Sequence, residues 1–188
     1  MKFCSHCGSG EILYKIPQGD NRLRYTCTQC EIIFYENPKI VAGCIAHWED
    51  RILMCKRAIE PRLGTWTLPA GFMENKETVQ EAAMRETYEE ATAQVANLQL
   101  YAIYNLPHIS QVYMMFKGEA VAGQASPGSE SLETAFMDEA EIPWSELSFP
   151  IIEETLNLYF HDRKQGEFKI HTGEIRRLDD KSIEVTRY

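Results

Sequence analysis

The chain lacks any long hydrophobic segment and any secretion signal. Its first residues, MKFCSHCG, contain no apolar run and no cleavage-site pattern, and no later stretch approaches the roughly 20 apolar residues of a membrane-spanning helix. It also has no internal repeat and no low-complexity block. We therefore expect a cytoplasmic protein with no membrane partner.

Basic residues are scarce relative to acidic ones. The 188 residues include 19 Lys and Arg against 28 Asp and Glu, which gives a net charge of −9 at pH 7. Such a surface repels polyanions, so nucleic acid is not expected as a partner. It also repels an anionic small substrate, unless a metal ion at an acidic cluster reverses the local field.

The amino-terminal segment has too few apolar residues to fold around a core of its own. It carries two Cys-x-x-Cys pairs separated by 19 residues, Cys4 with Cys7 and Cys27 with Cys30. This spacing is typical of four-cysteine zinc ribbons, in which Zn²⁺ coordination supplies the folding energy. Disulfides or free thiols are the alternatives, and His6 is not needed as a ligand. A closed site of this kind is structural, so catalytic metal ions have to lie elsewhere.

An acidic cluster lies in the stretch GFMENKETVQEAAMRETYEEATA. On a helix with about 100° per residue, Glu86, Glu89 and Glu90 fall within an arc of roughly 120° that also contains apolar residues. Carboxylates on such a stripe are costly without a cation, and Arg85 alone cannot balance three of them. Carboxylate oxygens favour Mg²⁺ or Mn²⁺. The alternative is a solvated acidic face with an ion pair from Glu81 to Arg85.

This stretch resembles the signature of the Nudix hydrolases, which cleave nucleoside diphosphates linked to another moiety. The matching positions are Gly71, Glu77, Arg85, Glu86, Glu89 and Glu90. The resemblance implies an enzyme in which the three helix glutamates and the carbonyl oxygen of Gly71 hold two or three Mg²⁺ (or Mn²⁺) ions, and a metal-activated water attacks one phosphorus of a pyrophosphate. Arg85 then positions the carboxylates, and Glu77 precedes the helix and orients the loop before it.

One departure from the signature concerns the end of the helix. Thr92 stands where the pattern has glycine. Glycine after a helix tolerates a positive φ angle and threonine resists it, so the exit of the helix is the part of the signature that we expect to differ.

The periodicity of the remaining chain indicates a mixed α/β or α+β domain. We predict strands at 39–47, 51–56, 101–106, 111–118 and 132–137, a helix at about 151–162, and a loosely held polar tail from Asp179 onward. The Nudix resemblance sharpens this to an α/β fold, an α/β/α sandwich around a mixed sheet at residues 37–188, preceded by the zinc ribbon at 1–36.

The resemblance extends over nearly the whole chain to ribbon-bearing Nudix enzymes of the plant FAD pyrophosphatase type, through NPK, IVAGCI, CKR, GTWTLPAGF, ESLE and TLNLY. These enzymes split FAD into FMN and AMP, and related enzymes accept ADP-ribose. NADH pyrophosphatases carry Ser-Gln-Pro-Trp-Pro-Phe-Pro after the signature, where this chain reads YNLPHISQVYMMF. The resemblance therefore implies a small dinucleotide substrate, FAD or ADP-ribose, with NADH second and RNA cap removal third. It also implies a homodimer.

Other site residues are less determined by the sequence. Glu130 and Glu133 lie in the turn-rich segment PGSESLET, which could reach over the site or be an ordinary surface turn, and Glu133 is our candidate for the catalytic set. Four aromatic residues could stack on a nucleotide or belong to the core: Trp66, Phe72, Tyr104 and Tyr113.

A rival hypothesis is a non-catalytic module that senses a nucleotide while the ribbon engages a partner. Turnover in the presence of Mg²⁺ distinguishes the enzyme from such a sensor.

Overall fold

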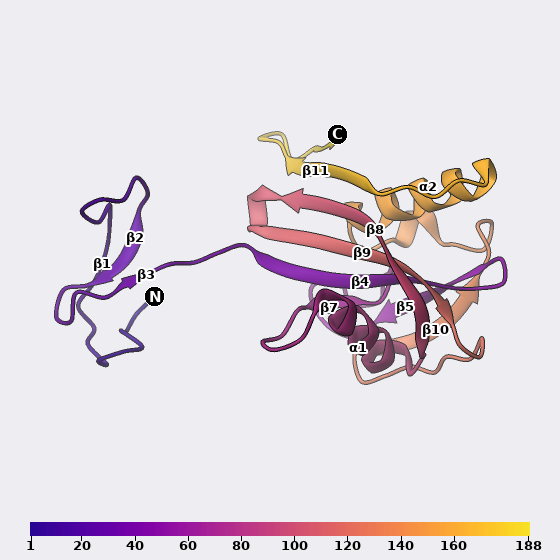
Figure 1. The fold of residues 1–188 in the computed structure, drawn as a ribbon, viewed down its shortest axis with the longest axis horizontal. Coiled ribbons are helices and arrows are strands. Elements are labelled where there is room, and N and C mark those ends of the chain that lie inside the picture. The colour runs from indigo at the N-terminus through magenta and orange to yellow at the C-terminus, as the bar shows by residue number, and fades with distance from the viewer. The chain divides into compact units, whose positions relative to one another are not determined.

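The amino-terminal unit is built on a small antiparallel sheet. The computed structural model describes all 188 residues, which divide into the units Met1–Asn37 and Pro38–Tyr188. The first unit has strand order β1-β2-β3, with these bounds: β1 Ile12–Lys15, β2 Arg24–Cys27 and β3 Ile33–Phe34 (Figure 1). Among its buried side chains are Cys4 and Cys27, so the cysteines take the place of an apolar core.

The second unit is organised around one mixed sheet. Its strand order is β10-β5-β4-β9-β8-β11-β12, with β6 paired to β5 and β7 paired to β4. The pairs β4 with β9 and β8 with β11 are parallel, whereas the other pairs are antiparallel. The strands are β4 Lys39–Trp48, β5 Arg51–Arg57, β6 Trp66–Thr67, β7 Ala70–Phe72, β8 Val95–Leu106, β9 Gln111–Ala120, β10 Ser131–Met137, β11 His171–Arg177 and β12 Ile183–Arg187.

Two α-helices cover opposite faces of this sheet (Figure 1). They are α1 Val79–Ala91 and α2 Pro150–Gln165, and two short 3₁₀ helices, η1 Pro107–Ile109 and η2 Trp144–Glu146, lie in connections. Along β5, Ile52 and Met54 join the core cluster that contains α2, whereas Leu53 and Cys55 join the one that contains the end of α1. Successive side chains of a strand point to opposite faces of the sheet, so β5 is buried on both of its faces. The predicted α/β/α sandwich around a mixed sheet is confirmed.

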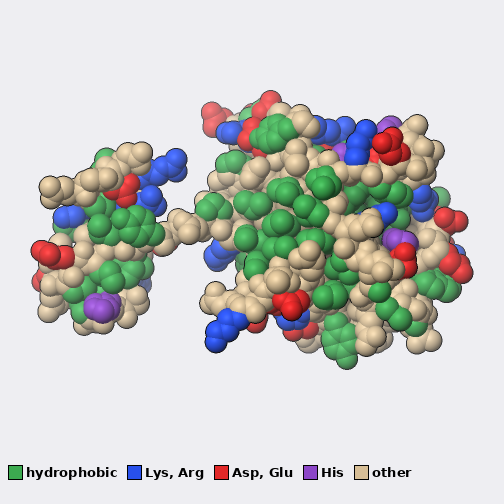
Figure 2. Space-filling model, in the orientation of Figure 1, with side chains coloured by type: hydrophobic (Ala, Val, Ile, Leu, Met, Phe, Trp, Pro, Cys, Tyr) green, Lys and Arg blue, Asp and Glu red, His purple; other side chains and the backbone are tan.

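The strands predicted at 39–47, 51–56, 101–106, 111–118 and 132–137 are present, and the predicted second helix is α2. No helix of the chain has the length and apolar character needed to cross a membrane. On the visible face of the second unit, hydrophobic side chains gather in the middle and charged ones lie toward the margins (Figure 2).

The loosely held tail is the prediction that the fold contradicts. Residues 183–187 form β12, which pairs with β11. Arg187 donates two hydrogen bonds to the carboxylate of Glu154 on α2, at 2.7 and 2.9 Å. The tail reads as polar because its side chains are exposed, but backbone pairing and this ion pair hold it in place.

Candidate active site

Helix α1 begins with a capping box. The hydroxyl of Thr78 accepts a hydrogen bond from the backbone N–H of Glu81 at 3.2 Å, and the Glu81 carboxylate accepts one from the backbone N–H of Thr78 at 2.7 Å. Glu81 is therefore engaged in the cap, and the alternative ion pair with Arg85 does not form. The Thr-x-x-Glu spacing before an apolar run is a sequence signal for this helix start.

The helix ends in the left-handed conformation despite the missing glycine. Thr92 is the C-cap with φ of 49°, and its N–H donates to the carbonyl oxygen of Tyr88 at 2.7 Å. Its hydroxyl lies within hydrogen-bond distance of the Ser126 hydroxyl, at 2.5 Å. The N–H of Gly128 caps the carbonyl oxygen of Glu90 at 2.9 Å. Local hydroxyl bonding thus replaces the freedom of glycine, and the expected change in the helix exit does not occur.

The three helix glutamates differ in burial. Glu90 is only 6% exposed, and the Glu86 side chain is 12% exposed. The Glu89 side chain is 58% exposed and lies at the edge of the stripe. The predicted stripe of carboxylates facing the protein interior therefore describes Glu86 and Glu90, and Glu89 only borders it.

Arg85 is fully engaged by its surroundings. It binds Glu77 through Nε at 3.0 Å and through Nη2 at 2.8 Å. Nη1 donates to Glu86 at 2.7 Å and to Glu89 at 3.0 Å. Nη2 also donates to the carbonyl oxygen of Phe72, at 3.1 Å. Glu77 lies before the helix, and the hydrogen bonds from Arg85 lower the pKa of its carboxyl to about 2. This arrangement fixes the carboxylates relative to the loop at Phe72.

Gly71 leaves the space that Glu86 occupies. A Cβ atom on Gly71 would lie 2.3 to 2.4 Å from the carboxylate of Glu86. Because β7 approaches α1 this closely, the Gly71 backbone and the Glu86 carboxylate lie directly against one another.

Glu90 has no cation partner of its own. It forms no ion pair, and burial, together with the charge of Glu86, raises its pKa to about 8 against the lowering effect of a hydrogen bond from the backbone of Ala70. Burial likewise raises the pKa of Glu86, which Arg85 partly offsets. Carboxylates that are buried side by side fit a divalent cation with oxygen preference, such as Mg²⁺.

The loop before β10 brings Glu130, rather than Glu133, toward these acids. The charge of Glu130 is a further cause of the raised pKa of both Glu86 and Glu90. Glu133 is on β10, 58% exposed at its side chain, and 3.9 Å from the ammonium of Lys56. A bulge in the pairing of β10 with β5 separates the two glutamates, and sequence alternation does not reveal it.

The four aromatic candidates lie in different environments. Tyr104 is fully buried and its hydroxyl donates to Glu154 at 2.7 Å, so it has no ring face for a nucleotide, and its predicted stacking role is wrong. Trp66 is 6% exposed and packs in the same core cluster. Tyr113 is half-buried against that cluster. Phe72 is 48% exposed, with the ammonium of Lys39 4.9 Å from its ring centre.

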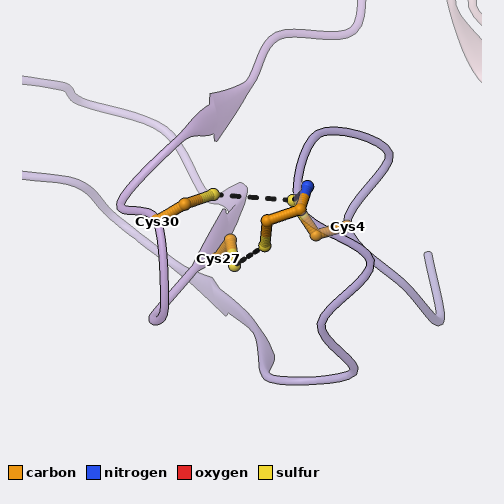
Figure 3. Close-up of side chains that lie close together, drawn as sticks. Cys4, Cys27 and Cys30 are labelled. Atoms are coloured by element: carbon orange, nitrogen blue, oxygen red, sulfur yellow. Dashed lines mark hydrogen bonds between the residues drawn. The ribbon is translucent and has the colours of Figure 1, made fainter.

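The four amino-terminal cysteines form a separate metal-binding geometry. Their sulfur atoms all lie within 4.8 Å of one another, with Cys4 to Cys30 at 3.7 Å and Cys7 to Cys27 at 3.6 Å. A tetrahedron with Zn–S bonds of about 2.3 Å has sulfurs about 3.8 Å apart, so the four thiols fit Zn²⁺. All four cysteines are free, and Figure 3 shows the side chains of Cys4, Cys27 and Cys30 pointing toward one another. His6 is not a member of this group.

Arg57, the last residue of β5, is a candidate that the sequence patterns did not single out. Its charge acts on Glu90 and on Tyr113. It lies in the CKR segment, but its closeness to the acids comes from the fold.

Both units of the chain match known families. Residues 37–155 match the NUDIX domain, and residues 2–36 match the Nudix N-terminal zinc ribbon. The crystal structure of a NUDIX hydrolase from Nitrosomonas europaea is similar with a TM-score of 0.90 and 50% sequence identity, over 94% of this chain and 99% of that one.

Curated relatives are more distant. The NAD-capped RNA hydrolase NudC of Photobacterium profundum is 29% identical over 84% of this chain and 59% of its own length. The ADP-ribose pyrophosphatase of Methanocaldococcus jannaschii is 30% identical over 58% of this chain and 67% of its own. The chain spans between 50% and 59% of the first two NudC relatives. With the signature residues on α1 and β7, the four-cysteine ribbon and a domain match over residues 37–155, the chain belongs to the Nudix hydrolase family.

Proposed function

We propose that this protein hydrolyses the pyrophosphate bond of a small nucleoside diphosphate-linked substrate, with ADP-ribose or FAD preferred, in a reaction that requires Mg²⁺ or Mn²⁺. The observation that carries the proposal is the pair of neighbouring carboxylates Glu86 and Glu90. Glu90 is buried and forms no ion pair, whereas Glu86 packs against Gly71 and shares the single cation Arg85 with Glu77 and Glu89. Such a pair is costly to bury unless a cation is bound there.

In this proposal Glu86, Glu89, Glu90 and the carbonyl oxygen of Gly71 hold the metal. Bound Mg²⁺ supplies positive charge for the phosphate oxygens and lowers the pKa of a water molecule. Arg85 keeps Glu86 and Glu89 in place through its contacts at 2.7 and 3.0 Å. Glu130 is preferred to Glu133 as the candidate for the proton acceptor, because its loop binds the end of α1 through Gly128 and Glu90, whereas Glu133 is exposed beside Lys56.

The substrate preference rests on two kinds of support. A relative from Methanocaldococcus jannaschii is named an ADP-ribose pyrophosphatase. The stretch typical of NADH pyrophosphatases is missing between Tyr101 and Phe116. FAD is proposed on the resemblance of the ribbon-bearing chain to FAD pyrophosphatases. A homodimer also belongs to the proposal by resemblance, and the mass in solution tests it.

A second candidate is an NAD-linked substrate, either NADH or an NAD-capped RNA. The relatives named NudC support it, and the one from Photobacterium profundum aligns over 84% of this chain. The net charge of −9 speaks against a long RNA as the preferred substrate.

The test is a panel of ADP-ribose, FAD and NADH with Mg²⁺, read as AMP release and compared by kcat/KM. We expect ADP-ribose or FAD to exceed NADH, and a clear NADH preference would favour the second candidate. Tight binding of all three without turnover would contradict the enzymatic proposal.

Substitutions identify the site responsible. Glu89→Gln and Glu90→Gln each remove a negative charge at constant shape, and we expect kcat to fall about 10²- to 10³-fold. Glu81→Gln is the matched control on the same helix, because glutamine also serves at the third position of a capping box. Equal losses in Glu81→Gln and the other two variants would contradict the assignment.

A further inference from the structure

Arg57 is held by contacts that leave part of its guanidinium free. Its Nε donates to the carbonyl oxygen of Pro61 at 3.0 Å, and its guanidinium carbon lies 5.3 Å from the ring centre of Phe149. It forms no ion pair and its two Nη groups make no hydrogen bond. An arginine fixed by stacking and by one backbone acceptor keeps two donor groups available in a defined orientation.

The fold connects Arg57 with the carboxyl end of α1. Arg57 pairs in register with Ser131, and the N–H of the next residue, Ala58, donates to the carbonyl oxygen of Glu130 at 2.8 Å. The same loop caps α1, since the N–H of Gly128 donates to the carbonyl oxygen of Glu90. The loop at 128–131 therefore ties the end of β5 to the acidic end of the helix.

Electrostatic effects agree with this placement. Burial raises the pKa of both Glu90 and Tyr113, and the positive charge of Arg57 partly opposes the increase in each case. These effects agree with the placement that the hydrogen bonds of the 128–131 loop give to Arg57.

The other cations near the acids are already occupied. Arg85 donates hydrogen bonds to Glu77, Glu86, Glu89 and the carbonyl oxygen of Phe72. Lys56 lies 3.9 Å from Glu133 and 5.6 Å from the ring centre of Trp66. Of these three cations, Arg57 is the one that has both a fixed orientation and free donors.

We propose that Arg57 binds a phosphate oxygen of the substrate through its Nη groups, beside the acidic cluster. This inference rests on the proposed pyrophosphate substrate. A planar guanidinium matches two phosphate oxygens at once, and the anchoring by Pro61 and Phe149 reduces the conformational entropy lost on binding.

The first test is direct binding of ADP in the presence of Mg²⁺, with adenosine as the uncharged probe. Arg57→Gln is expected to weaken ADP binding about 10-fold or more, in line with a lost charge-assisted hydrogen bond, and to leave adenosine binding unchanged. Arg57→Lys keeps the charge but loses the fork, so an intermediate affinity is expected.

A matched control is available on α2. Arg163 also lies over a phenylalanine, with its guanidinium carbon 4.9 Å from the ring centre of Phe160, and donates to the carbonyl oxygen of Asp50 at 2.6 Å. Arg163→Gln removes the same two kinds of contact, and we expect it to leave ADP binding unchanged.

The kinetic readout separates binding from metal use. In Arg57→Gln we expect the KM for ADP-ribose to rise about 10-fold or more while the Mg²⁺ concentration at half-maximal rate stays the same. The inference is overturned if ADP does not bind to the wild-type protein, or if its affinity is the same in Arg57→Gln or falls equally in Arg163→Gln. If ADP binding depends on Arg57 but neither ADP-ribose nor FAD is hydrolysed, the proposed function fails and the phosphate site stands.

Discussion

Gly71 is important because it has no side chain, which lets the Glu86 carboxylate pack against its backbone. The space in front of its Cα is filled by the Glu86 carboxylate, which is the far end of a flexible side chain. A methyl group on Gly71 can be accommodated by moving the Glu86 side chain. The substitution therefore preserves the fold but disturbs the position of this carboxylate.

We therefore expect Gly71→Ala to reduce kcat about 10²-fold or more with only a small change in thermal stability. The reason is that the added methyl group displaces the Glu86 carboxylate from the Gly71 backbone. Activity and melting temperature, measured together, check this. Gly10→Ala is the control, since its Cβ would meet only the Phe3 ring and the backbone of Lys2, at 3.7 to 4.0 Å. A large loss of stability in Gly71→Ala, or normal activity, would contradict the prediction.

For single residues, the sequence predicts which chemical groups share a face better than it predicts how exposed each side chain is. The helical period predicted that Glu86, Glu89 and Glu90 share a face toward the interior, and this holds for Glu86 and Glu90 but not for Glu89, whose side chain is 58% exposed. It could not distinguish Tyr104 from Phe72, since both are aromatic residues in strands. Burial of Tyr104 depends on α2, whose Glu154 lies far away along the chain and binds its hydroxyl.

At the scale of elements, the ribbon shows how four residues can replace a core. Its strands are short, and the cysteine sulfurs lie at distances suited to tetrahedral Zn²⁺. The segment before β4 therefore depends on metal for its structure.

We expect purified protein to contain about one equivalent of Zn²⁺ that resists chelators under native conditions, because the site is closed by four thiolates. Metal analysis and thiol titration measure this. Cys27→Ser should release the metal, and Cys44→Ser is a matched control because Cys44 lies in the core of the other unit. Less than about half an equivalent of zinc, with all four thiols reactive in the native state, would contradict the prediction.

Elements with local signals were predictable and elements with distant partners were not. Apolar runs at 39–47 and 51–56 gave β4 and β5, and Thr78 with Glu81 could have given the start of α1. The tail strand β12 carries an exposed, polar sequence, and its order depends on the pairing of Arg187 with Glu154. These two residues are 33 positions apart, and a contact of this kind leaves no periodic pattern in the sequence.

For the whole molecule, two buried carboxylates link stability to pH. Asp162 lies 2.7 Å from Nε2 of His171 and accepts a hydrogen bond from Tyr101 at 3.1 Å, and Glu154 is bound by Arg187 and Tyr104. Burial raises the pKa of each carboxyl, but the hydrogen bonds and ion pairs lower it by a larger amount. Both pKa values therefore lie below their usual range.

We expect the free energy of unfolding to fall as pH decreases below about 4.5, because the unfolded chain takes up protons at these carboxyls before the folded chain does. Above that pH both states carry the charge and the contribution is constant. Urea unfolding at a series of pH values measures the slope. The double variant Glu154→Gln, Asp162→Asn should be less stable at neutral pH and show a shallower slope, and an unchanged slope would exclude these two groups as its cause.

The last turn of α1 is arranged against its own helix dipole. It contains no basic residue, while Glu89 and Glu90 stand where the aligned peptide dipoles already create a partial negative charge. Arg85 offsets the charge of Glu89, but Glu90 forms no ion pair and costs helix stability in the absence of a metal ion, and the loop at 126–128 caps carbonyl groups without cancelling that charge. By thermodynamic linkage, an ion that neutralises the acids also relieves the helix. The acidic residues at the carboxyl end of α1 therefore lower the stability of the helix, and the negative potential that they create there attracts cations.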